Sequence, residues 1–182
     1  MQTLIEALQE ALKLLLALDP RLLGTVLLTL RITFSSLALS TLLGLPVGAA
    51  LGLAGRLPAR GLLMAALYTG MGLPPVVVGL FVFVLLSRSG PLGELGWLFT
   101  PTAMVFAQTI IALPLVIGLT MAAVGSAHPE LRPQLRALGA TRWQAVMTVL
   151  AETRLGLLAA IAAAYGRIVA EVGAVMLVGG NI

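Results

Sequence analysis

Arg167 and Glu171 are the residues whose type and spacing most directly suggest chemistry. They stand four positions apart in an apolar stretch, so a continuous helix would place both side chains on one face. Charged groups inside a membrane are costly unless they are paired or hydrated. Two interpretations stay open. The two residues form either a structural ion pair that holds helices together, which charge placement alone favours, or a pathway or gating element.

The sequence lacks the residue sets of the common catalytic sites. His128 is the single histidine, beside Pro129 in a polar stretch, and one histidine supports neither a metal site nor a Ser/His/Asp triad. We interpret it as a helix-start or surface residue. The motif G-x-x-x-x-G-K-[ST] is absent, so we do not expect ATP to bind here in that way. With no cysteine, the chain has no disulfide and no thiol-ligated metal site. We predict a non-catalytic chain without a cofactor of its own.

The composition indicates that membrane helices position these residues. Of the 182 residues, 59% are hydrophobic and 10% are charged, whereas a soluble domain carries about a quarter charged residues. So few charges cannot solvate a surface of this size in water. The net charge is +4, but the eleven lysines and arginines are spread along the chain, and a nucleic-acid-binding protein would cluster them on one face. We predict an all-α membrane protein, a polytopic helix bundle.

Residues 1–20 predict an N-terminal amphipathic helix at the membrane interface. Leucines recur at helical spacing, while Glu6, Glu10 and Lys13 fall on the other side. A partly inserted extra span is the alternative. Asp19-Pro20 ends this helix, and Pro20 can begin the next one.

About four membrane spans are predicted, within residues 32–53, 61–86, 98–124 and 155–177. Arg31 stands at the head of the first span. Gly44, Gly48 and Gly52 form a small-residue stripe along that span, which lets another helix approach closely.

Prolines interrupt two of the predicted spans. Pro74 and Pro75 remove two backbone donors within residues 61–86, which predicts a kink or break. Irregular backbone at membrane depth is tolerated only inside protein or against a water-filled cavity, so this break is a candidate pathway element. Pro114 predicts a second kink, in the third span.

The arginines between spans set the orientation: Arg56 and Arg60 lie in one loop, and Arg132, Arg136 and Arg142 in another. Two spans separate these loops, so both lie on the same side. The positive-inside rule places that side in the cytoplasm. The N-terminal helix and Asn181 are then expected outside.

The polar stretch 125–148 predicts a helix, a glycine turn and a second helix. Pro129 suits a first helical turn, and Leu131, Leu135 and Leu138 are expected on one face before Gly139 ends the helix. Thr141 with Gln144 forms a capping box for the second helix. The stretch is either a solvated connector or a docking element for a soluble partner, and spacing alone does not decide between them.

Residues 129–143, Pro-Glu-Leu-Arg-Pro-Gln-Leu-Arg-Ala-Leu-Gly-Ala-Thr-Arg-Trp, resemble the permease signature of ABC importers, often called the EAA motif. The match is best at Arg136, Leu138, Gly139, Ala140, Thr141, Arg142 and Trp143. The acidic-Ala-Ala start of the motif is replaced by Pro133, Gln134 and Leu135.

Two further stretches resemble the oxyanion branch of these permeases, those for molybdate and tungstate. One is Leu-Pro-Pro-Val-Val-Val-Gly at residues 73–79, and the other is the Arg-x-x-x-Glu-x-Gly-Ala core that begins at Arg167. The closing Val-Gly-Gly-Asn-Ile, which ends at Ile182, is most similar to tungstate permeases. The resemblance covers residues 20–182.

This resemblance implies the ABC importer type I permease fold over residues 21–182, with a cytoplasmic coupling region at 125–148. It implies a multi-pass protein of the bacterial or archaeal cell (inner) membrane that pairs with a second copy of itself around one pathway. A periplasmic or lipid-anchored binding protein would deliver the oxyanion, tungstate or molybdate, from outside. Two ATPase subunits would dock below and hold the ATP and magnesium. Such permeases usually continue with at least one more span, so we expect the last span to be missing from this sequence.

The resemblance also assigns roles to residues. Coupling to the ATPase falls to Leu135, Arg136, Leu138, Gly139, Ala140, Thr141 and Arg142, and the translocation pathway to Pro74, Pro75, Val76, Arg167 and Glu171. The alternatives are a permease for another substrate, sulfate or an amino acid, and an ATP-independent channel or membrane scaffold.

Overall fold

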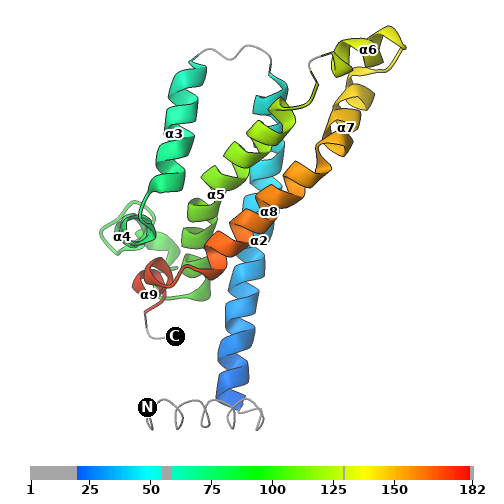
Figure 1. The fold of residues 1–182 in the computed structure, drawn as a ribbon. Helices are drawn as coiled ribbons and strands as arrows, with labels where there is room; N and C mark the ends of the chain where they lie inside the picture. The colour runs from blue at the N-terminus through cyan, green and yellow to red at the C-terminus, as the bar shows by residue number, and fades with distance from the viewer. Residues whose placement is uncertain (1–19, 55–58, 129, 181–182) are drawn as a thin grey trace, which may run out of the picture.

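The computed structural model describes residues 20–54, 59–128 and 130–180, and all the regular structure in these ranges is helical (Figure 1). The elements are α2 (Pro20–Leu53), α3 (Arg60–Gly72), α4 (Pro75–Leu86), the short 3-10 helix η1 (Gly93–Leu95), α5 (Pro101–Gly125), α6 (Leu131–Ala137), α7 (Arg142–Glu152), α8 (Arg154–Val169) and α9 (Gly173–Gly179). The all-α prediction is confirmed. Apart from Pro20, the predicted N-terminal amphipathic helix lies outside the described residues.

Within the residues that the structure describes, two helices are each long and apolar enough to cross a membrane, α2 with 34 residues and α5 with 25. At 1.5 Å per residue they extend about 51 Å and about 38 Å, more than the ~30 Å of a bilayer core. Of the described helices, α3 and α4 meet at a bend of 96°, and α7 and α8 at 63°. Counting each bent pair as one span gives up to four spans by length and composition. The second pair, at residues 142–169, does not coincide with the predicted fourth span at 155–177, which the structure divides between α8 and α9.

Helix α2 begins well before the predicted first span. Pro20 is its first residue, as the sequence predicts for a proline at a helix start. Arg31 therefore lies inside the helix and is not at its head, because arginine is a good helix former and does not interrupt the run. In Figure 1 the first turns of α2 extend beyond the other described helices.

Helices α2 and α5 pack along the predicted glycine stripe. A Cβ atom added to Gly48 would lie 2.6 Å from the carbonyl oxygen of Ile117, and one added to Gly52 would lie 2.8 Å from that of Met121. Only hydrogen fits at these positions, so the two backbones lie in direct contact. The predicted close approach of another helix is confirmed, and its partner is α5.

Helix α5 is the centre of the bundle, since it contacts α2, α3, α4, α8 and α9. The largest buried cluster joins α5 to α4 and α9, with Val82, Leu86, Ala107 and Val178 among its members. Pro114 lies inside α5, which continues as one helix across it.

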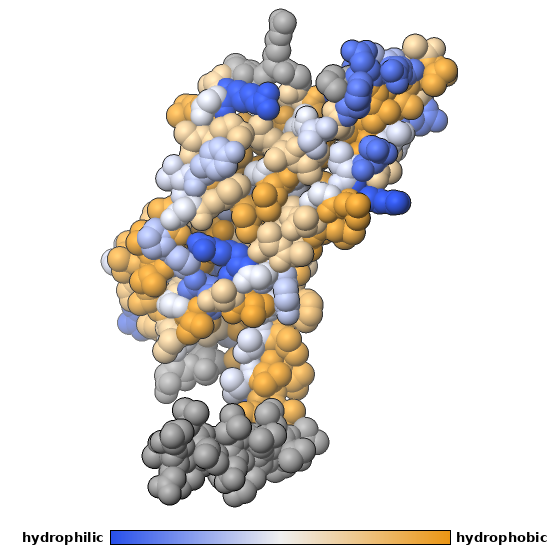
Figure 2. All heavy atoms as spheres, in the orientation of Figure 1, coloured by the Kyte–Doolittle hydropathy of each residue, from blue (hydrophilic) through white to orange (hydrophobic). Residues whose placement is uncertain are grey.

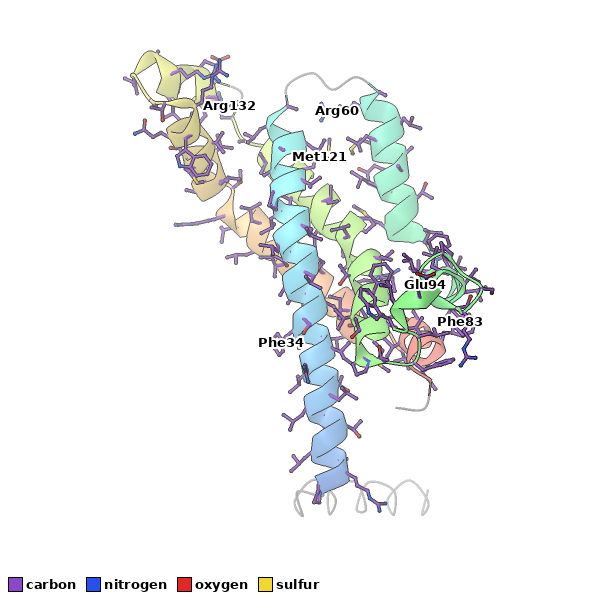
Figure 3. All side chains as sticks on the ribbon, turned by 180° about the vertical axis from the view of Figure 1, so that it is seen from behind. Phe34, Arg60, Phe83, Glu94, Met121 and Arg132 are labelled. Atoms are coloured by element: carbon purple, nitrogen blue, oxygen red, sulfur yellow. The ribbon has the colours of Figure 1, made fainter. Side chains whose placement is uncertain are left out.

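The two ends of the bundle differ in chemistry. The end of α2, the start of α3 and the α6–α7 pair lie together at the top of Figure 1, and Figure 3 shows the labelled Arg60 and Arg132 at this same end. Helices α4 and α9 lie towards the opposite end. This arrangement agrees with the predicted placement of both arginine-rich loops on one side of the membrane.

Candidate functional site

Helix α6 ends in a turn built from local signals. The N–H of Ala140 donates to the carbonyl of Leu135 at 3.0 Å, and the N–H of Gly139 donates to that of Arg136 at 3.0 Å. These are the two bonds of a Schellman motif, whose left-handed residue is usually glycine. Gly139 has φ +87°, a conformation that L side chains rarely adopt, while its Cβ position is open to space. Backbone conformation, and not crowding, is therefore what requires glycine here.

Helix α7 begins directly after this turn with the predicted capping box. The Gln144 N–H donates to Thr141 Oγ1 at 3.2 Å, and the Thr141 N–H donates to Gln144 Oε1 at 2.8 Å. Four residues, 138–141, therefore separate the end of α6 from the start of α7. The hydrogen bonds of the turn and of the cap are both local, so this connection is preorganised by its own sequence.

The α6–α7 element (residues 130–152) exposes two large apolar side chains among polar ones. Leu138 is 85% exposed, and Trp143 is 68% exposed. Arg136 and Arg142 are also exposed, and hydrophilic atoms gather over α6 and α7 in Figure 2. The sequence predicted Leu131, Leu135 and Leu138 on one helical face, but Leu138 follows the last helical residue, Ala137, and so lies outside the helix.

The opposite side of the α6–α7 element is anchored to the bundle. Val149 of α7 is buried with Ala49 of α2 and Val124 of α5, and Leu131 of α6 packs against this cluster. Arg132 Nη1 donates to the carbonyl oxygen of Leu53, the last residue of α2, at 2.6 Å. Sequence reasoning missed this contact, because the acceptor is a backbone carbonyl 79 positions away.

His128 lies at the entry to α6, where its Nδ1 accepts from the Glu130 N–H at 3.3 Å. This position agrees with its interpretation as a helix-start residue. Within residues 20–54, 59–128 and 130–180, no group of three or more His, Asp or Glu side chains is placed to hold a metal ion.

The second predicted site is the break between α3 and α4. Leu73 and Pro74 are extended, with ψ of 130° and 128°, and Pro75 starts α4. The predicted break is confirmed. The carbonyl of Leu73 faces α8, where it accepts a hydrogen bond from Arg167 Nη2 at 3.2 Å.

Glu171 does not share a helical face with Arg167, so this prediction is wrong. Helix α8 ends at Val169, and α9 starts at Gly173. Glu171 Oε1 instead accepts from the Ala174 N–H at 2.6 Å. In the part of the chain that the structure describes, neither residue forms an ion pair. The helix break separates the two side chains, and each satisfies a backbone group.

These two breaks, at residues 73–76 and 167–174, meet at one place, here called the break junction. A Cβ atom on Gly79 would lie 2.7 Å from Ala174 Cα, and one on Gly173 would lie 2.8 Å from Val76 Cγ2. The structure therefore brings the five predicted pathway residues to the same region of the bundle. Figure 2 shows hydrophilic atoms where the end of α8 approaches α4 and α9, on a face that is otherwise mostly apolar.

Beside the break junction lies a cavity of about 260 Å³ between α2, α5 and the end of α8, with Glu171, Tyr165 and Gln108 in its lining. Gln108 is 4% exposed, and its Oε1 accepts from Ser36 Oγ at 2.9 Å. Sequence reasoning did not single out Gln108, although a lone amide in the apolar run 101–125 was the available signal.

Residues 44–182 match the family described as the binding-protein-dependent transport system inner membrane component. The chain belongs to this family. The match includes the α6–α7 element and the break junction, and together with the membrane-length helices it confirms the predicted location in the cell inner membrane.

Curated relatives confirm the resemblance to the oxyanion branch. The chain is 44% identical over 154 residues to a probable anion ABC transporter permease protein of Haloferax volcanii, covering 85% of this chain and 66% of that protein. It is 34% identical over 182 residues to the tungstate uptake system permease protein of Peptoclostridium acidaminophilum, covering 100% and 79%. The corresponding protein of Campylobacter jejuni is 42% identical over 114 residues, covering 63% of this chain and 48% of that protein.

Proposed function

We propose that this chain is the transmembrane permease subunit of an ATP-driven importer for an oxyanion, with tungstate the first candidate and molybdate the second. The observation that carries the proposal is the α6–α7 element. It is a preorganised turn with exposed apolar side chains, in a member of a family of binding-protein-dependent transport components. The relatives named for tungstate and for anions support the substrate class.

In this proposal the α6–α7 element docks on an ATPase subunit that holds the ATP and magnesium. Leu138 and Trp143 lie in water at the arginine-rich end of the bundle, where their exposure is costly unless a partner covers them. Exposed Arg136 and Arg142 flank them and can pair with acidic groups of a soluble partner. The coupling residues proposed from the sequence, Leu135 to Arg142, belong to this surface or to the turn that shapes it.

The break junction is proposed to line the translocation pathway between two copies of the chain. Arg167 is partly exposed and has one hydrogen bond, to the Leu73 carbonyl, among the described residues. A guanidinium with further N–H donors to satisfy is costly against lipid tails. A face that carries Arg167, Glu171 and the irregular backbone at Pro74 is suited to a water-filled cavity. A second copy of the chain across that cavity would complete it.

The remaining parts of the proposal concern domains and partners. Residues 21–182 form the permease domain, with residues 125–148 as its coupling region. A periplasmic or lipid-anchored binding protein delivers the oxyanion at the end opposite to the α6–α7 element. This subunit carries out no bond chemistry, and hydrolysis belongs to the ATPase.

Gly139 offers the test. We expect Gly139→Val to abolish binding-protein-stimulated ATP hydrolysis and uptake in proteoliposomes, because a β-branched residue disfavours the left-handed turn. Gly139→Asn is the matched control, since asparagine tolerates that conformation better than other L residues. We expect Asn to retain most of the activity, and both variants to insert into the membrane.

Two results would contradict the proposal. Equal ATP-coupled uptake by the Val variant and the wild type would show that the turn at Gly139 is not needed for coupling to the ATPase. Oxyanion flux in liposomes without any ATPase would favour the ATP-independent channel. The substrate is tested separately, by measuring whether the partner binding protein retains tungstate, molybdate, sulfate or an amino acid.

A further inference from the structure

We infer that Arg132 is a positioning residue that ties the α6–α7 element to the end of α2, so that a displacement of α6 is passed to the α2–α5 pair. The inference rests on the proposed function, because it requires an ATPase that moves the α6–α7 element. It adds a residue that lies outside the docking surface and makes no contact with cargo.

The contact between Arg132 and α2 is short and directional. Nη1 donates to the Leu53 carbonyl oxygen at 2.6 Å. The last carbonyls of an α-helix lack partners within the helix, and a cation at that end also meets the negative pole of the helix dipole. Hydrogen bonds from a charged donor are shorter and stronger than neutral ones. Leu53 is therefore a natural acceptor for a guanidinium, and the bond resists a change of distance more than an apolar contact does.

The end of α2 is in turn packed directly against α5. One turn of the glycine stripe lies next to Leu53, where a Cβ atom on Gly52 would come within 2.8 Å of the Met121 carbonyl oxygen and 2.9 Å of Val124 Cβ. The Arg132 bond therefore acts on two spans at once.

Arg132 is distinguished from the neighbouring arginines by this bond. In the described ranges, the side chains of Arg136, Arg142 and Arg154 have no hydrogen bond or ion pair, and all three residues are exposed. Arg132 is partly buried, and its Nε is fully buried without a partner in the structure. Among the described residues the guanidinium thus has no second acceptor, and its polar link to α2 there is the single Nη1 bond.

This dependence on one bond makes the inference testable by substitution. Arg132→Met keeps much of the apolar stem and removes the donor, while Arg132→Lys retains a charge and a donor. We measure ATP hydrolysis and oxyanion uptake together, using the complete transporter in proteoliposomes. We expect Arg132→Met to keep ATP hydrolysis but to lower uptake per ATP by about tenfold or more, the factor that corresponds to losing one hydrogen bond to a charged group. Arg132→Lys should restore part of the ratio.

Arg154→Met is the matched control, because it removes an exposed arginine near the same element that bonds to nothing in the described chain. It should leave the ratio at the wild-type value. If Arg132→Met hydrolyses ATP and transports as efficiently as the wild type does, the inference is overturned. If the wild type itself transports without ATP, the proposed function fails instead.

A distance measurement keeps the test decisive if the Met variant does not assemble. The chain has no cysteine, so spin labels can be attached at Ala50→Cys in α2 and Gln134→Cys in α6, both exposed positions. If the Arg132 bond holds α6 to α2, the distance between the spin labels at positions 50 and 134 should be the same in the nucleotide-free and ATP-bound states of the otherwise wild-type transporter. A change of that distance on ATP binding would show that α6 moves without α2 and would refute the inference.

Discussion

Replacing Gly48 by alanine tests the packing that holds the two longest helices together. The added Cβ would lie 2.6 Å from the Ile117 carbonyl oxygen and 2.7 Å from Thr120 Cβ, whereas an ordinary contact begins at 3.4 Å. The shortfall at the carbonyl is 3.4 − 2.6 = 0.8 Å. A backbone oxygen within α5 cannot rotate away as a side chain can, so α2 and α5 must separate.

The cost follows from this separation. A gap of about 0.5–1 Å forfeits roughly a quarter to a half of each dispersion contact along an interface, and overpacked sites typically lose about 1–3 kcal/mol. Alanine also favours the helix by about 1 kcal/mol relative to glycine, which partly hides the loss. Gly24→Ala on the same helix gains that propensity term alone, since nothing lies within 4 Å of its Cβ position. The difference between the two variants therefore isolates the packing cost.

Thermal unfolding in detergent micelles, followed by circular dichroism of the helices, measures this difference. At about 2–4 °C per kcal/mol for a chain of this size, a packing cost of about 1–3 kcal/mol places the Tm of Gly48→Ala about 2–12 °C below that of Gly24→Ala. Equal Tm values for the two variants, or a higher value for Gly48→Ala, would show that α2 and α5 are not in direct backbone contact.

Two other substitutions separate function from stability. Leu138→Asp should change the free energy of unfolding by no more than about 0.5 kcal/mol, because the side chain is 85% exposed, while co-purification of the ATPase falls. Unchanged co-purification would exclude Leu138 from the docking surface. Glu171→Gln keeps an oxygen that can accept from the Ala174 N–H but removes the charge, so oxyanion uptake should fall with little change in Tm. Wild-type uptake in that variant would exclude the Glu171 charge from the pathway.

The parts of the structure that the sequence predicted well depend on neighbouring residues. The turn at Gly139 and the cap at Thr141 each follow from signals within four positions, and both occur where they were expected. The break at Pro74 is equally local, because two prolines disrupt a helix whatever surrounds it. Its bend of 96° was not predictable, since it depends on what α4 packs against.

The features that sequence reasoning missed depend on distant partners. No glycine or proline lies between Arg167 and Glu171, so the run reads as one helix. The chain leaves that helix where Arg167 bonds to Leu73 and Glu171 bonds to Ala174. The link from Arg132 to Leu53 joins a side chain to a backbone carbonyl. Every residue has such a carbonyl, so the sequence does not show which one accepts the bond.

The bend between α3 and α4 also has a consequence for how the protein is made. During synthesis, residues 60–86 enter the bilayer before α9 exists, and as one apolar run α3 and α4 are long enough to cross it. Helix α4 packs on α5 and on α9, and its Gly79 meets Ala174 from almost a hundred residues further along the chain. The contact of α4 with α5 can therefore form earlier in synthesis than its contact with α9. The break junction needs residues 167–174, which follow both α2 and α5 in the chain, so it is the last of these packed regions for which all the residues are available.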